Sequence, residues 1–287
     1  MTRFERVLEA RCELGESPVW SVERQALYFV DITGRRLHRY DPAAGRHESW
    51  PVDEDIGCVA PAADGGLVAA MRSGVWRLDE AGRKVRRLAA NPEDPATSRF
   101  NDGKVDPRGR FLAGTLDEPK AGGKAGLYRL GGGRLARLVD GVLTSNGLAW
   151  SPDGRTLYHA DTPRFVVRAY DYDLESGEIA GGRVFFERDA TAADRARPDG
   201  AAVDQEGCYW SALYDGARVA RHDPGGRLMA EYPAPTRKVT MPAFGGADLR
   251  TLYLTSARDP ATGEGGDLYA MAADVAGLPP TPFDPAA

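Results

Sequence analysis

Short strings of alternating apolar and polar residues run along the whole 287-residue chain, and turn-forming residues separate them. Apolar strings such as ALYFVD (26–31), RFLAGT (110–115) and TLYHAD (156–161) are each followed by two more alternating strings around turns such as DPAAG or LGGG. Alternation with a period of two around such turns is typical of antiparallel hairpins. No segment sustains an apolar period of 3.6 residues, so we expect little helix.

This four-strand unit repeats six times. Its first string begins at six equivalent positions, which hold Glu16, Gly57, Asn101, Asn146, Asp199 and Met241. The positions are roughly 40 to 53 residues apart, the length of a four-stranded propeller blade. Closure into a ring also protects the sheet edges. We therefore predict an all-β fold: one domain over residues 1–287, a six-bladed β-propeller with four-stranded antiparallel blades. The segment FERVLEA (4–10) is expected to pair into the last blade.

Four of the six equivalent positions carry polar side chains, namely Glu16, Asn101, Asn146 and Asp199. The first strand of a blade lines the central channel, so these side chains are expected to meet at one mouth of it. Asn-Gly and Asp-Gly are common turn formers, and any one of them alone would be interpreted as a turn. Glu16 is not a turn former, and its presence in the same position favours a site.

The oxygen atoms of Glu16, Asn146 and Asp199 suit a hard divalent cation such as Ca²⁺, Mg²⁺ or Mn²⁺. Zn²⁺ also accepts carboxylates, but the four histidines of the chain lie outside this position. Arg99 and Asn101 would face the same mouth, where the planar fork of an arginine suits the oxygen atoms of a substrate.

Three long connections are expected to wall the mouth, at residues 116–125, 186–198 and 258–266. In the first of them, Asp117 and Glu118 are candidates to accept hydrogen bonds from sugar hydroxyls. A solvated turn explains these two residues equally well.

Other conspicuous residues are assigned structural roles. Asp31 and Asp161 end equivalent strings and are expected to bond turn amides. Trp20 and Trp150 are also equivalent and are expected to fill the core between blades. The triple glycine at 131–133 precedes no helix and no Lys-Ser/Thr pair, so it predicts a hairpin turn and not a phosphate loop.

Composition narrows the choice of partner and compartment. The net charge is −5 with both signs interspersed, which disfavours nucleic acid and anionic membrane as partners. No apolar stretch approaches the ~18 residues of a membrane span. Three scattered cysteines, Cys12, Cys58 and Cys208, lack a C-x-x-C spacing and argue against a disulfide framework. We expect these cysteines to be buried, and the protein to be cytoplasmic and, by default, a monomer.

Several strings of the chain, taken together, point to a known family: GESPVW (15–20), RFNDGKVDPRGRFLAGT (99–115), SNGLAWSPDGRTLY (145–158), PDGAAVDQEG (198–207) and FGG (244–246). They resemble the regucalcin (senescence marker protein)/gluconolactonase family, in order and over nearly the whole chain. The family is a six-bladed propeller of sugar-lactone hydrolases, which agrees with the fold predicted from the repeats.

The resemblance also implies roles for individual residues. Glu16, Asn146 and Asp199 match the ligands of one divalent metal ion (Ca, Zn, Mn or Mg), and Asp199 matches the proposed general base. Arg99 and Asn101 match positions that contact the sugar lactone.

The family also uses an acidic residue just after the string AGT. This chain reads Leu116-Asp117-Glu118-Pro119 there, with Pro119 at one position where animal members carry a glutamate. Asp117 and Glu118 are both candidates for the role.

The implied activity is metal-dependent hydrolysis of an aldonolactone, similar to glucono-1,5-lactone, to the aldonic acid. Asp199 would activate the attacking water. A carboxylate bound to a cation is a weaker base than a free one, so a metal-bound hydroxide is an alternative nucleophile. Two other functions are alternatives: a metal-dependent esterase or phosphotriesterase, and a non-catalytic calcium-binding propeller.

Overall fold

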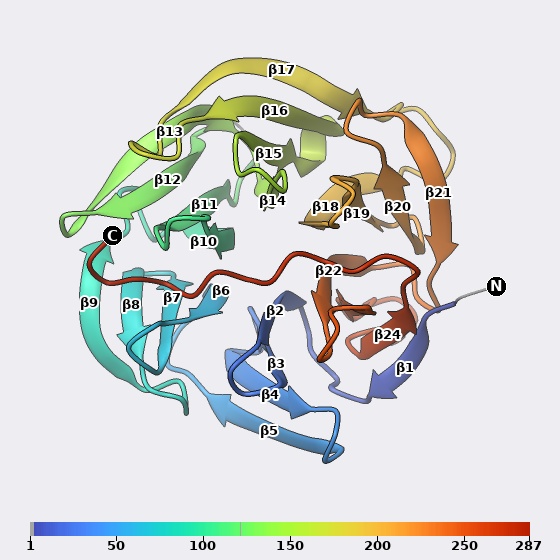
Figure 1. The fold of residues 1–287 in the computed structure, drawn as a ribbon, viewed down its shortest axis with the longest axis horizontal. Helices are drawn as coiled ribbons and strands as arrows, with labels where there is room; N and C mark the ends of the chain where they lie inside the picture. The colour runs from blue at the N-terminus through green and yellow to red at the C-terminus, as the bar shows by residue number, and fades with distance from the viewer. Residues whose placement is uncertain (1–2, 121) are drawn as a thin grey trace.

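The chain forms a ring of six four-stranded antiparallel sheets in the computed structural model, which describes residues 3–120 and 122–287 (Figure 1). Each sheet is one blade, and its first strand lies nearest the central axis. This confirms the predicted all-β, six-bladed propeller.

Blade 1 contains β2 (Gly15–Ser21), β3 (Ala26–Asp31), β4 (Arg36–Asp41) and β5 (Arg46–Pro51). Blade 2 contains β6 (Ile56–Pro61), β7 (Leu67–Met71), β8 (Gly74–Leu78) and β9 (Lys84–Ala90). Blade 3 contains β10 (Ser98–Val105), β11 (Phe111–Asp117), β12 (Ala125–Gly131) and β13 (Arg134–Val142).

Blade 4 contains β14 (Ser145–Trp150), β15 (Thr156–Asp161), β16 (Val166–Tyr172) and β17 (Ile179–Glu187). Blade 5 contains β18 (Arg197–Val203), β19 (Tyr209–Tyr214), β20 (Arg218–His222) and β21 (Leu228–Pro233). Blade 6 contains β22 (Val239–Gly245), β23 (Thr251–Ser256), β24 (Leu268–Ala272) and β1 (Glu5–Leu8). The single helix of the described residues is the 3₁₀ turn η1 (Thr162–Arg164). No helix in the described part of the chain is long and apolar enough to cross a membrane.

The N-terminal strand closes the ring. β1 pairs antiparallel with β24, where Glu5 lies opposite Ala270 and Arg6 opposite Tyr269. Phe4, just before β1, is buried among side chains of blades 5 and 6. The outer strand of the last blade therefore comes from the other end of the chain, as predicted for the segment FERVLEA.

The core is a ring of small cores, one between each pair of neighbouring blades. Trp20 lies between blades 1 and 6, stacked on Tyr253 with ring centroids 6.0 Å apart. Trp150 lies between blades 3 and 4. Both indole rings are buried, which confirms their predicted core role. Burial of these apolar faces is the main favourable contribution to blade packing.

The smaller structural predictions are also confirmed. Asp31 accepts hydrogen bonds from the backbone amides of Glu13 and Leu14, both at 2.9 Å, and Asp161 bonds amides in the equivalent place of blade 4. The triple glycine 131–133 forms the hairpin turn between β12 and β13, with positive φ at its last two residues. All three cysteines are free and buried.

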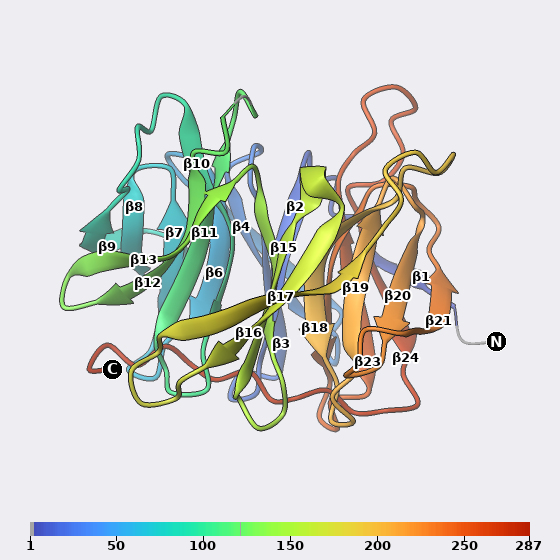
Figure 2. The ribbon, with the colours of Figure 1, turned by 90° about the horizontal axis from the view of Figure 1, so that it is seen from above.

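The C-terminal segment, residues 273–287, crosses the face of the ring opposite the long connections (Figures 1 and 2). The Gln205 amide donates to the carbonyl of Ala276 at 2.9 Å, and Phe283 is buried between blades 2 and 3 with 5% exposure. A cavity of about 310 Å³ lies between the inner strands and residues 278–281. None of the predicted site residues lines this cavity.

If the C-terminal segment is docked as described, Phe283→Ala should destabilise the protein by about 3 kcal/mol, the usual loss for truncating a buried aromatic side chain. Urea unfolding followed by fluorescence measures this. Leu228→Ala is the control, because Leu228 is 49% exposed on an outer strand and should change stability by less than about 0.5 kcal/mol. Equal stability of Phe283→Ala and the parent protein would contradict the docking.

Candidate active site

A bulge follows the start of the inner strand in every blade. The pairing with the second strand shifts between Glu16 and Val19 in blade 1 and between Asn146 and Ala149 in blade 4. The other four blades show the same shift. A bulge re-aims side chains and increases the local twist, and bulges are frequent beside functional sites. Because the bulge is repeated, each blade can direct a side chain toward the same end of the channel.

A glycine is required at one of these bulges. Gly147 follows Asn146 with φ of +61°, a left-handed conformation. A Cβ at this position would lie 2.4 Å from the hydroxyl oxygen of Tyr209 and 3.0 Å from the carbonyl oxygen of Asp199. The Asn-Gly pair is therefore part of the close packing of blade 4 on blade 5.

Four of the predicted site residues form one hydrogen-bonded line across blades 3, 4 and 5. Arg99 Nη1 donates to Asn101 Oδ1 at 2.9 Å, and Asn101 Nδ2 donates to Asn146 Oδ1 at 2.9 Å. Asn146 Nδ2 in turn donates to Asp199 Oδ1. These four residues meet as predicted, although Asn101 and Asn146 are 45 residues apart in sequence and Asn146 and Asp199 are 53 apart.

The side-chain amides of Asn101 and Asn146 have few hydrogen-bonding positions left free. Asn101 Nδ2 also donates to the carbonyl of Ser145 at 3.0 Å, and Asn146 Nδ2 also donates to Thr162 Oγ1 at 2.9 Å. Both amide nitrogens therefore use two hydrogens within the protein. Each amide oxygen accepts one hydrogen bond and retains a lone pair for a further partner. Asn101 accordingly orients Asn146 as well as facing the mouth.

Glu16 faces this group from blade 1. It is 6% exposed, and its Oε2 accepts a hydrogen bond from the amide of Ser17 at 3.0 Å. Burial, followed by the nearby charge of Asp102, raises the pKa of Glu16 to about 8. Burial and the charge of Glu16 likewise raise the pKa of Asp199 well above its usual value. The two carboxyl groups are therefore close enough to repel each other.

Two charged residues beside this site were not singled out in the sequence. Asp102 is buried and its pKa is raised by burial; its Oδ2 accepts from the amide of Leu148 at 2.9 Å, and its Oδ1 has no partner among the described residues. The ammonium group of Lys104 donates to the carbonyl of Ala201, and burial lowers the pKa of Lys104 to about 8. Both residues could have been found in the sequence, because each is a charged residue within a predicted inner strand.

The donor set fits a hard divalent cation. Glu16, Asp102 and Asp199 are buried carboxyl groups whose ionised forms are disfavoured, and a nearby positive charge reverses that preference. Asn146 adds an amide oxygen. Over residues 3–120 and 122–287, no group of three His, Cys, Asp or Glu side chains has the spacing of a metal centre. A cation held by the carboxylates of Glu16 and Asp199 would therefore also depend on the amide oxygen of Asn146 and on water.

Arg99 brings unpaired hydrogen-bond donors to the same place. Its side chain is 7% exposed, and its Nη1 donates to the carbonyl of Phe100 and to Asn101 Oδ1, both at 2.9 Å. Among the described residues it forms no ion pair, and burial lowers its pKa. A buried guanidinium with donors left over suits a ligand rich in oxygen atoms.

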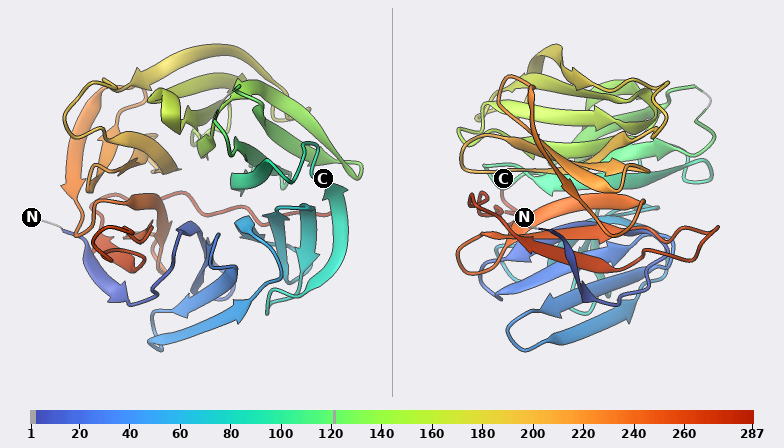
Figure 3. Two further views of the ribbon diagram at one scale, coloured as in Figure 1. Left: turned by 180° about the vertical axis from the view of Figure 1, so that it is seen from behind. Right: turned by 90° about the vertical axis from the view of Figure 1, so that its right-hand side faces the viewer.

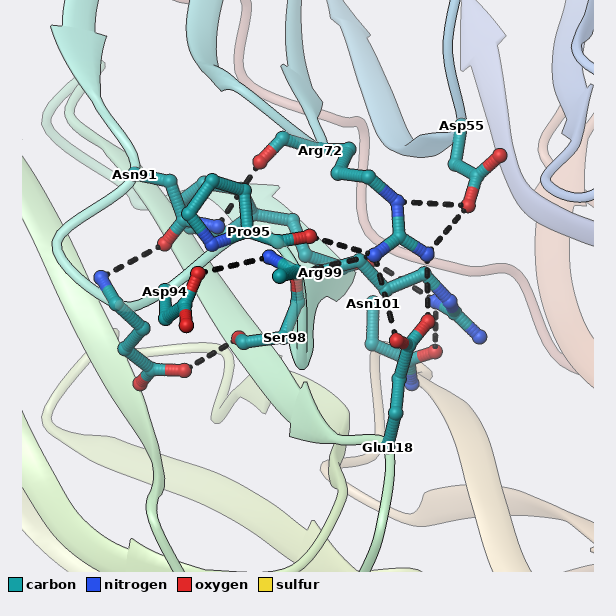
Figure 4. Close-up of polar contacts among 12 residues, drawn as sticks. Asp55, Arg72, Asn91, Asp94, Pro95, Ser98, Arg99, Asn101 and Glu118 are labelled. Carbon is teal, nitrogen blue, oxygen red and sulfur yellow. Dashed lines mark hydrogen bonds and ion pairs between the residues drawn. The ribbon is translucent and has the colours of Figure 1, made fainter.

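The structure separates the two acidic residues after the string AGT. Asp117 is 3% exposed, and its Oδ2 accepts from the amide of Gly122 at 3.3 Å, within its own turn. Glu118 instead accepts a hydrogen bond from Arg72 (Figure 4). Glu118 is therefore the better placed of the two to meet a substrate. Figure 3 (left) views the ring from the side opposite the C-terminal segment, where this mouth lies.

A family model for the SMP-30/Gluconolactonase/LRE-like region matches residues 14–258. This chain belongs to that family. The match begins just before β2 and ends just after β23, so it includes the inner strand of every blade. The family resemblance noted in the sequence is therefore confirmed.

Named relatives of the family align over most of their length. The 6-deoxy-6-sulfogluconolactonase of Pseudomonas putida is 48% identical over 247 residues, covering 86% of this chain and 84% of the relative. The pentonolactonase XacC of Haloferax volcanii is 39% identical over 276 residues, covering 95% and 91%. Among solved structures, the calcium-binding protein regucalcin from Agrobacterium tumefaciens superposes with a TM-score of 0.90 at 26% identity, covering 97% and 96%.

The close packing at the Asn-Gly bulge makes a stability prediction. Gly147→Ala and Gly132→Ala each place a side chain in the left-handed region, at a cost of roughly 1–2 kcal/mol. Gly132 has open space around it, whereas a Cβ at Gly147 overlaps Tyr209, which should add about 1–3 kcal/mol. Urea unfolding compares the two variants. An equal loss of stability in both would contradict the packing described for blades 4 and 5.

Proposed function

We propose that this member of the family is a sugar lactonase, which hydrolyses an aldonolactone to the aldonic acid. The observation that carries the proposal is the line from Arg99 to Asp199 beside Glu16 at one end of the channel. It combines unpaired donors, buried carboxyl groups and amide oxygens in one place. Two relatives whose names describe them as lactonases, one for a sulfogluconolactone and one for pentonolactones, support the substrate class.

The proposed reaction begins with attack of a water oxygen on the lactone carbonyl carbon. Asp199 accepts the proton that the water loses, since its Oδ2 has no hydrogen-bond donor among the described residues while Oδ1 is held by Asn146. The bond between the carbonyl carbon and the ring oxygen then breaks, and Asp199 returns its proton to the ring oxygen, which becomes a hydroxyl. Arg99 donates to substrate oxygen atoms and thereby orients the lactone.

A divalent cation is part of this proposal. Glu16, Asn146 and Asp199 are the residues that would hold it. When bound, such a cation would supply Lewis-acid chemistry. Burial opposes ionisation of Glu16 and Asp199, and a nearby positive charge would favour it. The regucalcin structure described as a calcium-binding protein supports a divalent ion.

Proton release from a panel of aldonolactones tests the proposal. After chelation and dialysis, we expect turnover of one or more lactones to fall to the spontaneous rate and to return with one of Ca²⁺, Mn²⁺, Mg²⁺ or Zn²⁺. The spontaneous hydrolysis of each lactone is subtracted. Turnover that is indifferent to chelation would contradict the role of the cation. Absence of turnover with every metal would contradict the lactonase proposal and favour another ester substrate or a binding role.

Asp199→Asn separates proton transfer from cation binding. We expect kcat to fall by about 10²–10⁴-fold, the usual contribution of a general base, while calorimetry still detects cation binding. Asp223→Asn is the matched control, since Asp223 lies in the same blade and its carboxylate bonds backbone amides of an outer turn. Full turnover by Asp199→Asn with the cation bound would exclude Asp199 as the base.

A further inference from the structure

Arg72 lies at the centre of the hydrogen bonds on one side of the mouth (Figure 4). It occupies the tight turn between β7 and β8, and the sequence analysis gave it no role. Its guanidinium donates to Asp55 Oδ2 at 2.8 and 3.1 Å and to both oxygens of Glu118, at 2.5 and 3.4 Å. It also donates to the carbonyls of Pro95 and Ser98, at 2.9 and 3.4 Å.

These contacts join three separate parts of the ring. Asp55 lies in the connection from blade 1 to blade 2, Pro95 lies in the connection from blade 2 to blade 3, and Glu118 follows the second strand of blade 3. The backbone is tied in the same way, since the amide of Arg72 donates to the carbonyl of Asp55 at 2.9 Å and the amide of Glu118 to that of Thr97 at 3.0 Å. One guanidinium therefore holds this side of the mouth together.

The surroundings favour the charged forms of Arg72 and Asp55 in this cluster. Hydrogen bonding to Glu118 is the largest influence that raises the pKa of Arg72. Hydrogen bonds from Arg72 and Arg35 outweigh burial and lower the pKa of Asp55. The Asp55 side chain is 9% exposed, but that of Glu118 is 36% exposed. Glu118 is thus the acid of the cluster that faces solvent at the mouth.

The cluster also lies close to the predicted site. The charges of Asp55 and Glu118 raise the pKa of Arg99, and the charge of Arg72 lowers it, although burial has the largest effect. Arg99 is hydrogen-bonded to Asn101, the first amide of the line that ends at Asp199. A ligand held by Arg99 would therefore lie within reach of the residues that Arg72 bonds at the edge of the mouth, Asp55 and Glu118, which we call the rim.

We propose that Arg72 is a positioning residue for the sugar lactone: it holds the Glu118 carboxylate at the mouth as a fixed acceptor for substrate hydroxyls. This inference rests on the proposed lactonase function. Nε, Nη1 and Nη2 of Arg72 all donate to protein acceptors, so Arg72 itself offers little to a substrate. A carboxylate has about four lone-pair positions, and Glu118 keeps some of them free for hydroxyl donors.

Loss of Arg72 should release Glu118 into solvent. Without the guanidinium, the carboxylates of Asp55 and Glu118 repel each other, and the exposed side chain of Glu118 regains its rotamer freedom. A substrate hydroxyl would then have to order the Glu118 side chain on binding, which weakens substrate binding. The effect should therefore be on substrate binding and on discrimination between lactones that differ at one hydroxyl, and not on proton transfer at Asp199.

The test is a double-mutant cycle with Arg72→Met, Glu118→Ala and the double variant, assayed with the metal-loaded enzyme. For the best lactone and its epimer at one ring hydroxyl, we expect each single variant to raise KM about tenfold and to change kcat less than threefold. The preference between the epimers should fall in both variants. The double variant should be no worse than Glu118→Ala within about twofold, because both changes remove the same interaction.

Arg77→Met is the matched control. Arg77 lies in the same blade and pairs with Asp64 near the opposite face of the ring, so its loss should leave KM and the epimer preference unchanged. If Arg72→Met does not fold, Arg72→Lys replaces it, because lysine keeps the charge but cannot hold both carboxylate oxygens.

Three results would overturn the inference while leaving the lactonase proposal intact: additive losses in the double variant, an unchanged KM in Glu118→Ala, or an equal fall in kcat for both epimers in Arg72→Met. If the unaltered protein hydrolyses no lactone with any metal, the failure belongs to the proposed function.

Discussion

The free-energy cost of burying three carboxyl groups at one end of the channel is the constraint on which the site depends. Three carboxyl groups are buried here, those of Glu16, Asp102 and Asp199. Away from water, an ionised carboxylate is stable only with a partner. Lys104 lies on the same strand as Asp102, and burial lowers the pKa of its amine to about 8. Arg99 contributes a second buried cation. The fold thus concentrates carboxyl groups whose ionised forms are disfavoured by burial and would be stabilised by a cation. Such an arrangement is understandable as a site and costly as a core.

The packing of the ring explains why two of the six blades contribute no polar side chain to the site. Every inner strand carries the same bulge, but two of the six equivalent positions hold Gly57 and Met241. A Cβ at Gly57 would lie 2.5 Å from the carbonyl oxygen of Phe100, so the backbone of blade 3 takes that space. A Cβ on Gly200 would lie 2.4 Å from the Cβ of Met241, so Met241 occupies that space. Close packing of neighbouring inner strands at these two places leaves the polar side chains to the other four blades.

Much of the fold and the inner site could be predicted from the sequence, because the repeat period converts equivalent positions into neighbours in space. Glu16 and Asp199 could be placed together on that ground alone. Arg72 could not, since an arginine in a two-residue turn is indistinguishable in sequence from a solvated charge. The orientation of Glu118 depends on Arg72, so it could not be predicted from the sequence either. The C-terminal segment 273–287 has no alternating pattern, so its docking across the ring had no local signal.

The two halves of the site differ in how firmly the fold determines them. The inner residues start strands that are packed on both sides, so their side chains are placed by backbone geometry that every blade shares. Glu118 belongs to a connection, whose backbone is free to vary between its ends, and its place depends on a side chain from another blade. Sugar lactones that differ by one hydroxyl present the same carbonyl to the inner residues. Under the proposed function, discrimination between them would depend on the acceptors beside the inner residues, of which Glu118, held by its ion pair with Arg72, is one.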